Sequence, residues 1–447
     1  MRLLIFLLLF FVHVSVNGAI IYLSPSGNDG NAGTIGSPKK TLAGAWAVVS
    51  AGDTIYLRGG THAYDVMQYL QSRNGTAGNR INIWGYPGET AIITRSGSYA
   101  VVNGVNQDLI YCEGNYLYWK DLEIANFTQL SGETPYPALR FGFTNHSILE
   151  NIKYHDNMSP LKITGASYNN LIKNCDFYRQ SDPYGSDGAG TDAYDGGDGL
   201  VIGDITASTD TNYLVGCRFW WNVDDGCDFW NNGAVIKMDS CWAFWNGYLP
   251  GTFTTAGNGS GFKLGQGLST STSVKRIITR CIAASNRNWG FVENNTLYNM
   301  RLYNNTASNN GTLNWWFGDW GASPKTFTNN LSLGGGCLYG DCESYYSQVI
   351  GADAILTTNS WQGFTVTDAD FQSTDSTQLT GARTSGTLPN MTYLKLVSGS
   401  DLVDSGTEVG YGNDIGALQY EIETPAGPPT ITGRKFNYIG RKYNFKY

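Results

Sequence analysis

Short apolar runs that alternate with polar residues recur along most of this chain and are separated by Asn and Gly. Six of these runs align on one position, which holds Cys175, Cys217, Cys241, Cys281, Asn305 and Asn330. Neighbouring members are 24 or 25 residues apart, except for gaps of 42 and 40 that contain insertions. A repeat of about 24 residues built from short strands is typical of one turn of a parallel β-helix. We therefore predict an all-β solenoid with three strands per coil.

The aligned position is expected to face the interior. Its asparagines would satisfy backbone groups at the turns, and its cysteines would serve as small apolar side chains in the reduced state. Asn151, which lies 24 residues before Cys175, is assigned to the same column. Cys337 and Cys342 are the candidates for a disulfide bridge. A β-propeller expects repeats of about 40 to 45 residues and is disfavoured, because only the two long gaps match that length.

The ends of the chain predict its organisation. An apolar run from Leu3 to Val14 indicates a signal peptide over residues 1–19, so we expect a secreted, extracellular protein. An N-terminal cap and first coils, with a short helix near residues 42–50, are expected over 20–99, and the remaining β-helix over 100–360. Residues 361–421 would pack back on the coils, and 422–447 would form a Pro-rich linker and a basic, aromatic tail.

Composition narrows the class of partner. The chain has 56 glycines and 13% aromatic residues, which suits many short strands and tight turns. Its formal net charge is -8 at pH 7, which leaves no basic face for nucleic acid. The mature chain has no second apolar run long enough to cross a membrane, and we expect a monomer without a membrane span.

A charge cluster follows in the middle of the repeats. Four aspartates and one lysine stand among glycines and tryptophans, in a chain with only 15% charged residues: Asp198, Asp224, Asp225, Asp228 and Lys263. Calcium prefers several carboxylate oxygens, so the aspartates predict a Ca²⁺ site. Asp224 and Asp225 reach one ion only at a turn, which Gly226 would permit. Lys263 is the candidate general base, provided that its pKa falls towards the working pH.

The same residues carry a resemblance to a known family. DGL at Asp198, VDDGCD at Asp224 to Asp228, CWAFWNG at Cys241 and GNGSGFKLG around Lys263 resemble the family 9 pectate lyases. This resemblance implies a right-handed parallel β-helix and calcium-dependent cleavage of polygalacturonate, or a related uronate polymer, by β-elimination. It further implies that the four aspartates bind calcium and that Lys263 is the base. Cys227 stands in place of the motif's usual tryptophan. An insertion follows Asp198, so Asp192 and Asp195 are alternative ligands.

Binding of an acidic polysaccharide would require cations and aromatic rings along the same groove. Arg218, Lys237, Arg280 and Arg287 are the candidates for uronate carboxylates, and Trp221 and Trp245 for sugar rings. Two other functions stay open at this point. One is a β-helix glycoside hydrolase that uses Asp224 and Asp225 as its acid and base. The other is a non-catalytic carbohydrate-binding β-helix.

Overall fold

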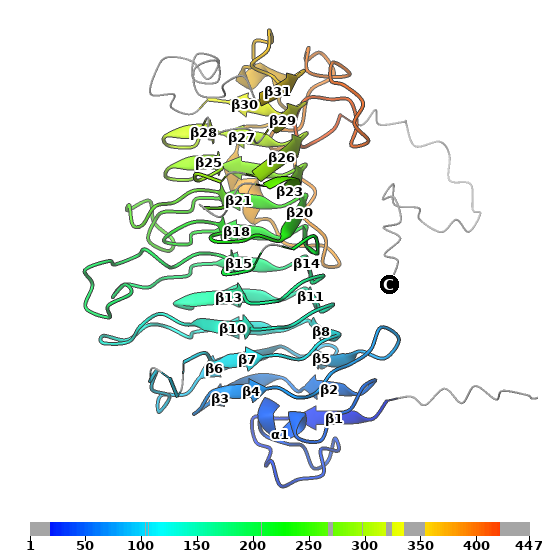
Figure 1. Ribbon diagram of the computed structural model, residues 1–447, viewed down its shortest axis with the longest axis vertical. Helices are drawn as coiled ribbons and strands as arrows, with labels where there is room; N and C mark the ends of the chain where they lie inside the picture. The colour runs from blue at the N-terminus through cyan, green and yellow to red at the C-terminus, as the bar shows by residue number, and fades with distance from the viewer. Residues whose placement is uncertain are drawn as a thin grey trace, which may run out of the picture.

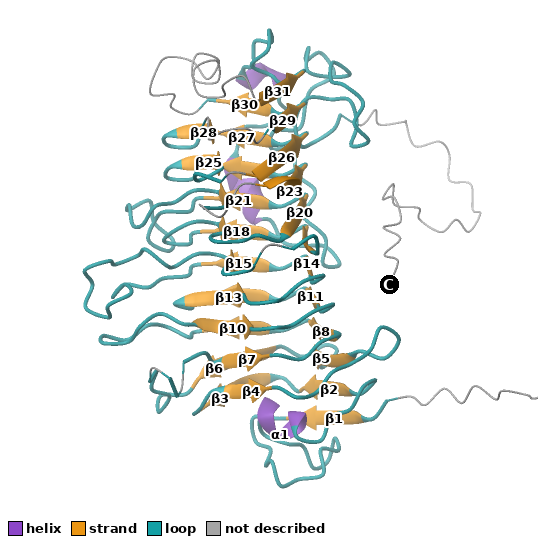
Figure 2. Cartoon of the chain, in the orientation of Figure 1, coloured by secondary structure: helices purple, strands orange, loops and turns teal. Residues whose placement is uncertain are grey.

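The computed structural model describes residues 18–420, apart from residues 103, 106, 207, 267–270, 297, 319–323 and 335–353. The apolar part of the signal peptide, the bridge between Cys337 and Cys342, and the basic tail therefore lie outside the described residues. Within them the chain winds into coils stacked along one axis, with the N-terminal coil at one end (Figure 1). Figure 2 shows that strands and loops form nearly all of this stack.

Three parallel sheets run along the stack, and successive coils add one strand to each. The 12-stranded sheet contains, in spatial order, β1 (Ile20–Leu23), β2 (Thr54–Leu57), β5 (Ile81–Gly85), β8 (Leu117–Lys120), β11 (Ile148–Glu150), β14 (Leu171–Lys173), β17 (Thr211–Val215), β20 (Val235–Asp239), β23 (Ser271–Thr279), β26 (Tyr298–Tyr303), β29 (Lys325–Thr328) and β31 (Ala354–Thr357). The 10-stranded sheet contains β3 (Gly60–Tyr64), β6 (Ala91–Arg95), β9 (Glu123–Ala125), β12 (Lys153–His155), β15 (Asp176–Tyr178), β18 (Arg218–Trp220), β21 (Trp242–Phe244), β24 (Ile282–Ala284), β27 (Thr306–Ser308) and β30 (Leu331–Leu333). The 9-stranded sheet contains β4 (Gln68–Leu70), β7 (Ile110–Cys112), β10 (Pro137–Phe141), β13 (Ser159–Ile163), β16 (Val201–Ile202), β19 (Cys227–Asp228), β22 (Phe262–Lys263), β25 (Trp289–Val292) and β28 (Leu313–Trp316). The predicted parallel β-helix with three strands per coil is confirmed.

The aligned column of cysteines and asparagines lies at the corner between the 12-stranded and 10-stranded sheets. All six of its members are fully buried, as predicted. Asn305 donates through Nδ2 to Ile278 O at 2.9 Å and accepts the Cys281 amide at 2.9 Å. These bonds repeat from coil to coil, so each asparagine satisfies backbone groups that the turn leaves unpaired.

The assignment of Asn151 to this column is wrong. β11 pairs with β14 so that Glu150 lies opposite Lys173, which aligns Asn151 with Asn174 and places Ile152 beside Cys175. Asn151 and Asn174 both have a φ of 54° and form the turn just before the column. The left-handed conformation suits asparagine, so the sequence signal was real but belonged to the neighbouring position.

The cysteine column is reduced, as expected. The thiols of Cys112, Cys175, Cys217, Cys227, Cys241 and Cys281 are all free and buried. The Cys217 thiol lies 3.5 Å from Ile172 O and 3.7 Å from Val215 O, so its weak S–H donor meets backbone acceptors. Free cysteine here fills the stacked interior as a small apolar side chain.

Both ends of the stack are covered. Helix α1 (Leu42–Trp46) begins at Thr41, whose hydroxyl accepts the Gly44 amide, and it buries Leu42 and Trp46 against the first coils. It is shorter than the predicted helix over 42–50. Beyond the coils, residues 361–420 include two short 3₁₀ helices, η1 (Asp368–Asp370) and η2 (Ser376–Thr380). This segment, orange in Figure 1, runs back alongside the coils.

A second apolar cluster joins the C-terminal segment to the coils. Leu379 and Tyr393 of that segment are buried in the same cluster as Trp220, Trp242 and Phe244 from the 10-stranded sheet. The outer face of that sheet is therefore covered by the chain itself. Since the 10-stranded sheet is occupied in this way, an extended ligand has to use another face.

Candidate functional site

The acidic cluster forms on the 9-stranded sheet, at its three neighbouring strands β16, β19 and β22. Asp228 ends β19 and lies opposite Lys263 of β22. Val201 of β16 lies opposite Asp228 on the other side. Asp198 stands just before β16, and Asp224 and Asp225 lie in the bend that leads into β19. Parallel pairing thus brings together residues that are up to 65 positions apart in the chain.

A ladder of asparagines and glycines explains why these coils stack so closely. Asn222, Asn246, Asn286 and Asn310 are fully buried and bond one another in turn. A Cβ on Gly226 would meet Asn246 Nδ2 at 2.8 Å and Gly261 O at 2.6 Å. Gly226 is therefore required by this close approach, and not by a special backbone turn as the sequence suggested.

The glycine ladder also sets the positions of the residues that precede it. A Cβ on Gly199, Gly261 or Gly290 would collide in the same way with the ladder asparagine of its own coil. The preceding residues therefore form one column, namely Asp198, Asp225, Ser260 and Trp289. Backbone bonds from Gly199 N to Asp225 O, Gly226 N to Ser260 O and Gly261 N to Trp289 O confirm this register.

The four aspartates and the lysine surround one buried point. Lys263 Nζ lies 3.1 Å from Asp225 Oδ2 and 3.1 Å from Asp228 Oδ2. One carboxylate oxygen each from Asp198, Asp225 and Asp228 lies within 4.8 Å of the other two. All four aspartates are buried, while 16% of the Lys263 side chain is exposed. The predicted ligands and the predicted base are thus brought together.

Insertions in the two neighbouring coils close over the cluster, as their place in the sequence suggested. The Asn258 amide donates to Asp224 Oδ1 at 2.7 Å, and the Ser260 amide donates to Asp225 Oδ1 at 2.6 Å. Asp198 Oδ1 accepts the Asp225 amide at 3.2 Å. Asp225 Oδ2 and Asp228 Oδ1 are buried without a hydrogen-bond partner. Oxygen atoms are therefore left over that face the interior of the cluster.

The electrostatics of the cluster call for more positive charge. Burial and the charges of the neighbouring aspartates raise the pKa of Asp198 and of Asp224 well above the usual range. Burial also raises the pKa of Asp228 to about 6, although Lys263 opposes that shift. Burial lowers the pKa of Lys263, but the four carboxylates outweigh it and the net shift is upward. Four acids against one ammonium, with unbonded carboxylate oxygens, match the hard oxygen site that a divalent cation such as Ca²⁺ prefers.

Asp192 and Asp195 do not replace Asp198. Both are exposed in the insertion loop, and Asp192 Oδ2 accepts a hydrogen bond from Ser186 Oγ. Asp198 is the residue whose carboxylate joins Asp225 and Asp228. The insertion after Asp198 adds residues between β16 and β17 and leaves the pairing of β16 with β19 intact.

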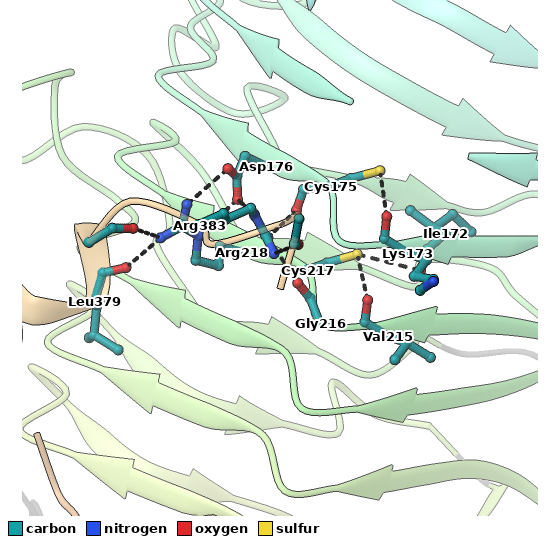
Figure 3. A network of polar contacts seen from close by, with 12 residues as sticks. Ile172, Lys173, Cys175, Asp176, Val215, Gly216, Cys217, Arg218, Leu379 and Arg383 are labelled. Carbon is teal, nitrogen blue, oxygen red and sulfur yellow. Dashed lines mark hydrogen bonds and ion pairs between the residues drawn. The ribbon is translucent and has the colours of Figure 1, made fainter. Parts of the chain in front are cut away.

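Arg218 was wrongly assigned to the binding groove. It lies on β18 in the 10-stranded sheet, where its guanidinium bonds both oxygens of Asp176 and its Nη1 donates to Leu379 O and Gly381 O (Figure 3). Only 5% of its side chain is exposed. The corner between β18 and β19 separates Arg218 from Asp224, although only five residues lie between them in the sequence.

The other predicted groove residues are divided among the faces. Lys237 is exposed on β20 of the 12-stranded sheet, over the Tyr213 ring. Arg280 follows β23 in the turn between the 12-stranded and 10-stranded sheets and pairs with Asp239. Both are therefore remote from the aspartates in the cross-section of the coil. Arg287 is the exception, because its Nη1 donates to Ala256 O and Gly257 O in the loop that carries Asn258 and Ser260.

The two predicted tryptophans belong to the apolar cluster under the C-terminal segment. Trp221 and Trp245 pack on each other with ring centroids 5.1 Å apart. Trp245 is only 6% exposed, so its ring is not available to a sugar. Sequence reasoning missed the asparagine ladder, although its spacings of 24, 40 and 24 repeat those of the cysteine column.

Comparison with known proteins gives a consistent result. The family described as "Pel9A-like, right handed beta helix region" matches residues 21–330. Pectate lyase L of Dickeya dadantii is 30% identical over 424 residues, which covers 90% of each chain. Pectate lyase PEL9 of Emericella nidulans is 31% identical over 420 residues, or 87% of this chain and 95% of its own.

Two solved structures are similar over most of the chain. Pectate lyase Pel9A superposes with a TM-score of 0.73 at 27% identity, covering 91% of this chain and 97% of that one. A rhamnogalacturonan lyase superposes with a TM-score of 0.70 at 26% identity, covering 85% of this chain and 97% of its own.

Proposed function

The chain belongs to the Pel9A-like right-handed β-helix family, and from this premise we propose that it is a secreted, calcium-dependent lyase of polygalacturonate or a related uronate polymer. Relatives named as pectate lyases cover nearly the whole chain, so its activity is that of a polysaccharide lyase. This favours elimination over the hydrolase and the non-catalytic alternatives. The single observation that carries the proposal is Lys263 Nζ at 3.1 Å from two carboxylates of a buried aspartate cluster.

The aspartates would hold the calcium ion. Asp198, Asp225 and Asp228 offer oxygens within 4.8 Å of one another, and Asp224 keeps its Oδ2 free of the Asn258 amide. When bound, calcium supplies positive charge that neutralises the uronate carboxylate and so acidifies the adjacent C–H group. The backbone amides of Asn258 and Ser260 hold Asp224 and Asp225 in place, which fixes the ligands before the substrate arrives.

Lys263 is the group placed to accept the proton. In β-elimination a base removes the proton next to the carboxylate, the bond from the neighbouring carbon to the glycosidic oxygen breaks, and a carbon–carbon double bond forms between the two carbons. Lys263 Nζ accepts that proton in its neutral form, which burial favours. Its partly exposed side chain lies on the outer face of β22, where a polymer reaches it.

Secretion is supported by the apolar run from Leu3 to Val14. Among the described residues, no helix has the length and apolar character needed to cross a membrane.

The test measures the double bond directly. The mature protein is incubated with polygalacturonate, and separately with rhamnogalacturonan, in calcium at alkaline pH while the ultraviolet absorbance of unsaturated uronide ends is followed. We expect absorbance that a chelator abolishes and that Lys263→Ala lowers at least about 1,000-fold, a size comparable to the loss of other key catalytic groups. Lys237→Ala, an exposed lysine on the 12-stranded sheet, is the matched control and should keep full activity. New reducing ends without absorbance would indicate a hydrolase, and neither signal on either polymer would contradict the proposal.

A further inference from the structure

One row of side chains runs along the whole outer face of the 9-stranded sheet. The printed pairings join one residue from each strand in register: Tyr69, Tyr111, Arg140, Lys162, Val201, Asp228, Lys263, Val292 and Trp316. Residues next to the row, such as Cys112, Phe141 and Ile163, are buried core. Because side chains alternate along a strand, the row faces outward. It follows the long axis of the molecule and passes through Asp228 and Lys263 (Figure 1).

The row differs on the two sides of Lys263. Towards the N-terminus it carries two cations, each already paired: Lys162 with Asp204 at 3.0 Å, and Arg140 with Asp108 at 2.7 Å. Towards the C-terminus the row continues with Val292 and Trp316, neither of which is charged. A sugar bound on the C-terminal side would therefore meet an apolar surface within this row.

Trp316 does not stand alone. Its ring stacks on that of Trp289, with centroids 4.6 Å apart and planes 22° apart. Trp289 belongs to the column of Asp198 and Asp225, since Gly261 N donates to Trp289 O. Both tryptophans are half-buried, so each leaves part of its ring accessible. The stacked pair thus extends the same face of the sheet that carries the aspartates and Lys263.

The distance suits one polymer chain. Trp316 lies two strands beyond Lys263 in the row, and neighbouring strands are about 4.8 Å apart, which places it roughly 10 Å away along the axis. Pyranose rings present C–H groups on their faces, and large aromatic rings bury such apolar area at low entropic cost.

We propose that Trp289 and Trp316 form a sugar-binding platform that holds one pyranose ring of the substrate by its apolar face. The proposal rests on the proposed lyase function and adds a statement about substrate class. Because the platform carries no charge of its own, it accepts a neutral sugar as readily as a uronate. The enzyme would then tolerate polymers in which uronates alternate with neutral hexoses, provided that a uronate occupies the aspartate site.

Binding without turnover tests this platform. In the Lys263→Ala background with calcium, titration calorimetry measures the affinity for a short oligogalacturonide, a long one, and a long oligomer of alternating uronate and neutral sugar. Adding Trp316→Ala should weaken both long ligands about tenfold, equivalent to about 1.4 kcal/mol, and leave the short ligand nearly unchanged. Trp316→Phe, which keeps a ring, should retain most of the affinity.

Controls separate the platform from general damage. Trp221→Ala removes a stacked, half-buried tryptophan outside this row and should leave all three affinities unchanged. Thermal melting identifies folded variants, and Trp316→Leu replaces Trp316→Ala if the latter melts early. Unchanged affinity of a folded Trp316 variant for both long ligands would overturn the platform alone. Binding of no uronate oligomer by the Lys263→Ala parent would overturn the proposed function and, with it, the platform.

Discussion

Asp176 holds the C-terminal segment to the coils, and replacing it by asparagine should destabilise the protein strongly. Its carboxylate accepts Arg218 Nε and Nη2 at 2.8 and 2.9 Å, and Arg383 Nε and Nη2 at 3.0 and 2.7 Å (Figure 3). Asp176 is 6% exposed, and Arg383 lies in the segment that covers the 10-stranded sheet. Asp176→Asn keeps the shape of the side chain and removes the charge that two guanidinium groups share.

The magnitude follows from the charge that is left behind. Arg218 and Arg383 would retain bonds to backbone carbonyls, including those of Leu379 and Gly216, but no carboxylate among the residues shown in Figure 3. Breaking a buried pair by removing one partner typically costs about 3–5 kcal/mol, and we expect a loss of about 4 kcal/mol. Asp121→Asn is the control, because Asp121 lies 3.5 Å from Lys120 with both side chains well exposed. Its loss should stay under about 0.5 kcal/mol.

The pH dependence gives an independent check. Burial raises the pKa of Asp176, but Arg218 and Arg383 lower it further, so that the net pKa lies below the ordinary value. A depressed carboxyl pKa stabilises the fold above the unfolded value of about 3.9, and this contribution is lost as the pH falls through the folded pKa. The difference between parent and Asp176→Asn should therefore be full at pH 7 and shrink below about pH 4.

Guanidinium chloride unfolding, followed by tryptophan fluorescence with matched chelator, measures this difference at several pH values. A loss of less than about 1 kcal/mol at pH 7 would refute the reasoning from buried charge. So would a difference that stays constant from pH 7 to about pH 3, because protonation of Asp176 has to remove it.

Three further predictions concern the metal, the ladder and the thiols. Calcium at about 100 times its Kd should stabilise the fold by roughly 2.7 kcal/mol in calorimetry, and Asp228→Asn should remove that gain; an equal gain in the variant would exclude Asp228 as a ligand. Asn246→Ala should cost about 3 kcal/mol in denaturant unfolding, since Phe219 O and the Asn222 amide lose their partner; a loss below about 1 kcal/mol would contradict the ladder's role. The column thiols, including Cys175 and Cys241, whose pKa burial raises, should resist a disulfide reagent until unfolding, and peptide mapping of labelled folded protein would reveal any exception.

The repeat was readable because stacking imposes identical demands on successive coils. Cys175, Cys217 and Cys241 recur at one position since each fills the same interior site, and Asn305 and Asn330 recur since each satisfies the same turn amides. The error at Asn151 has the same origin. A coil of 23 residues precedes a coil of 24 or more, and counting along the chain does not reveal which coil is shorter.

The chemistry of the aspartates and Lys263 could also be predicted, whereas the substrate groove could not. The four acids and the lysine lie in three consecutive coils, and any parallel stack brings them together. Arg218 and Trp221 looked equally close in the chain, but a corner intervenes and the C-terminal segment covers their side. Conversely, Trp316 lies 53 residues after Lys263 in the sequence and only two strands from it on the same face.

The sequence by itself determined the β-helix, its approximate period, the reduced cysteine column and the acidic cluster with its lysine. These features are local or periodic, so the spacing of residues along the chain contains them. Only the tertiary structure decided which of three faces each side chain occupies, that Lys263 lies 3.1 Å from Asp225 and Asp228, and which face stays open. The physical reason is that the face depends on where each coil turns, and the open face depends on where a distant segment packs.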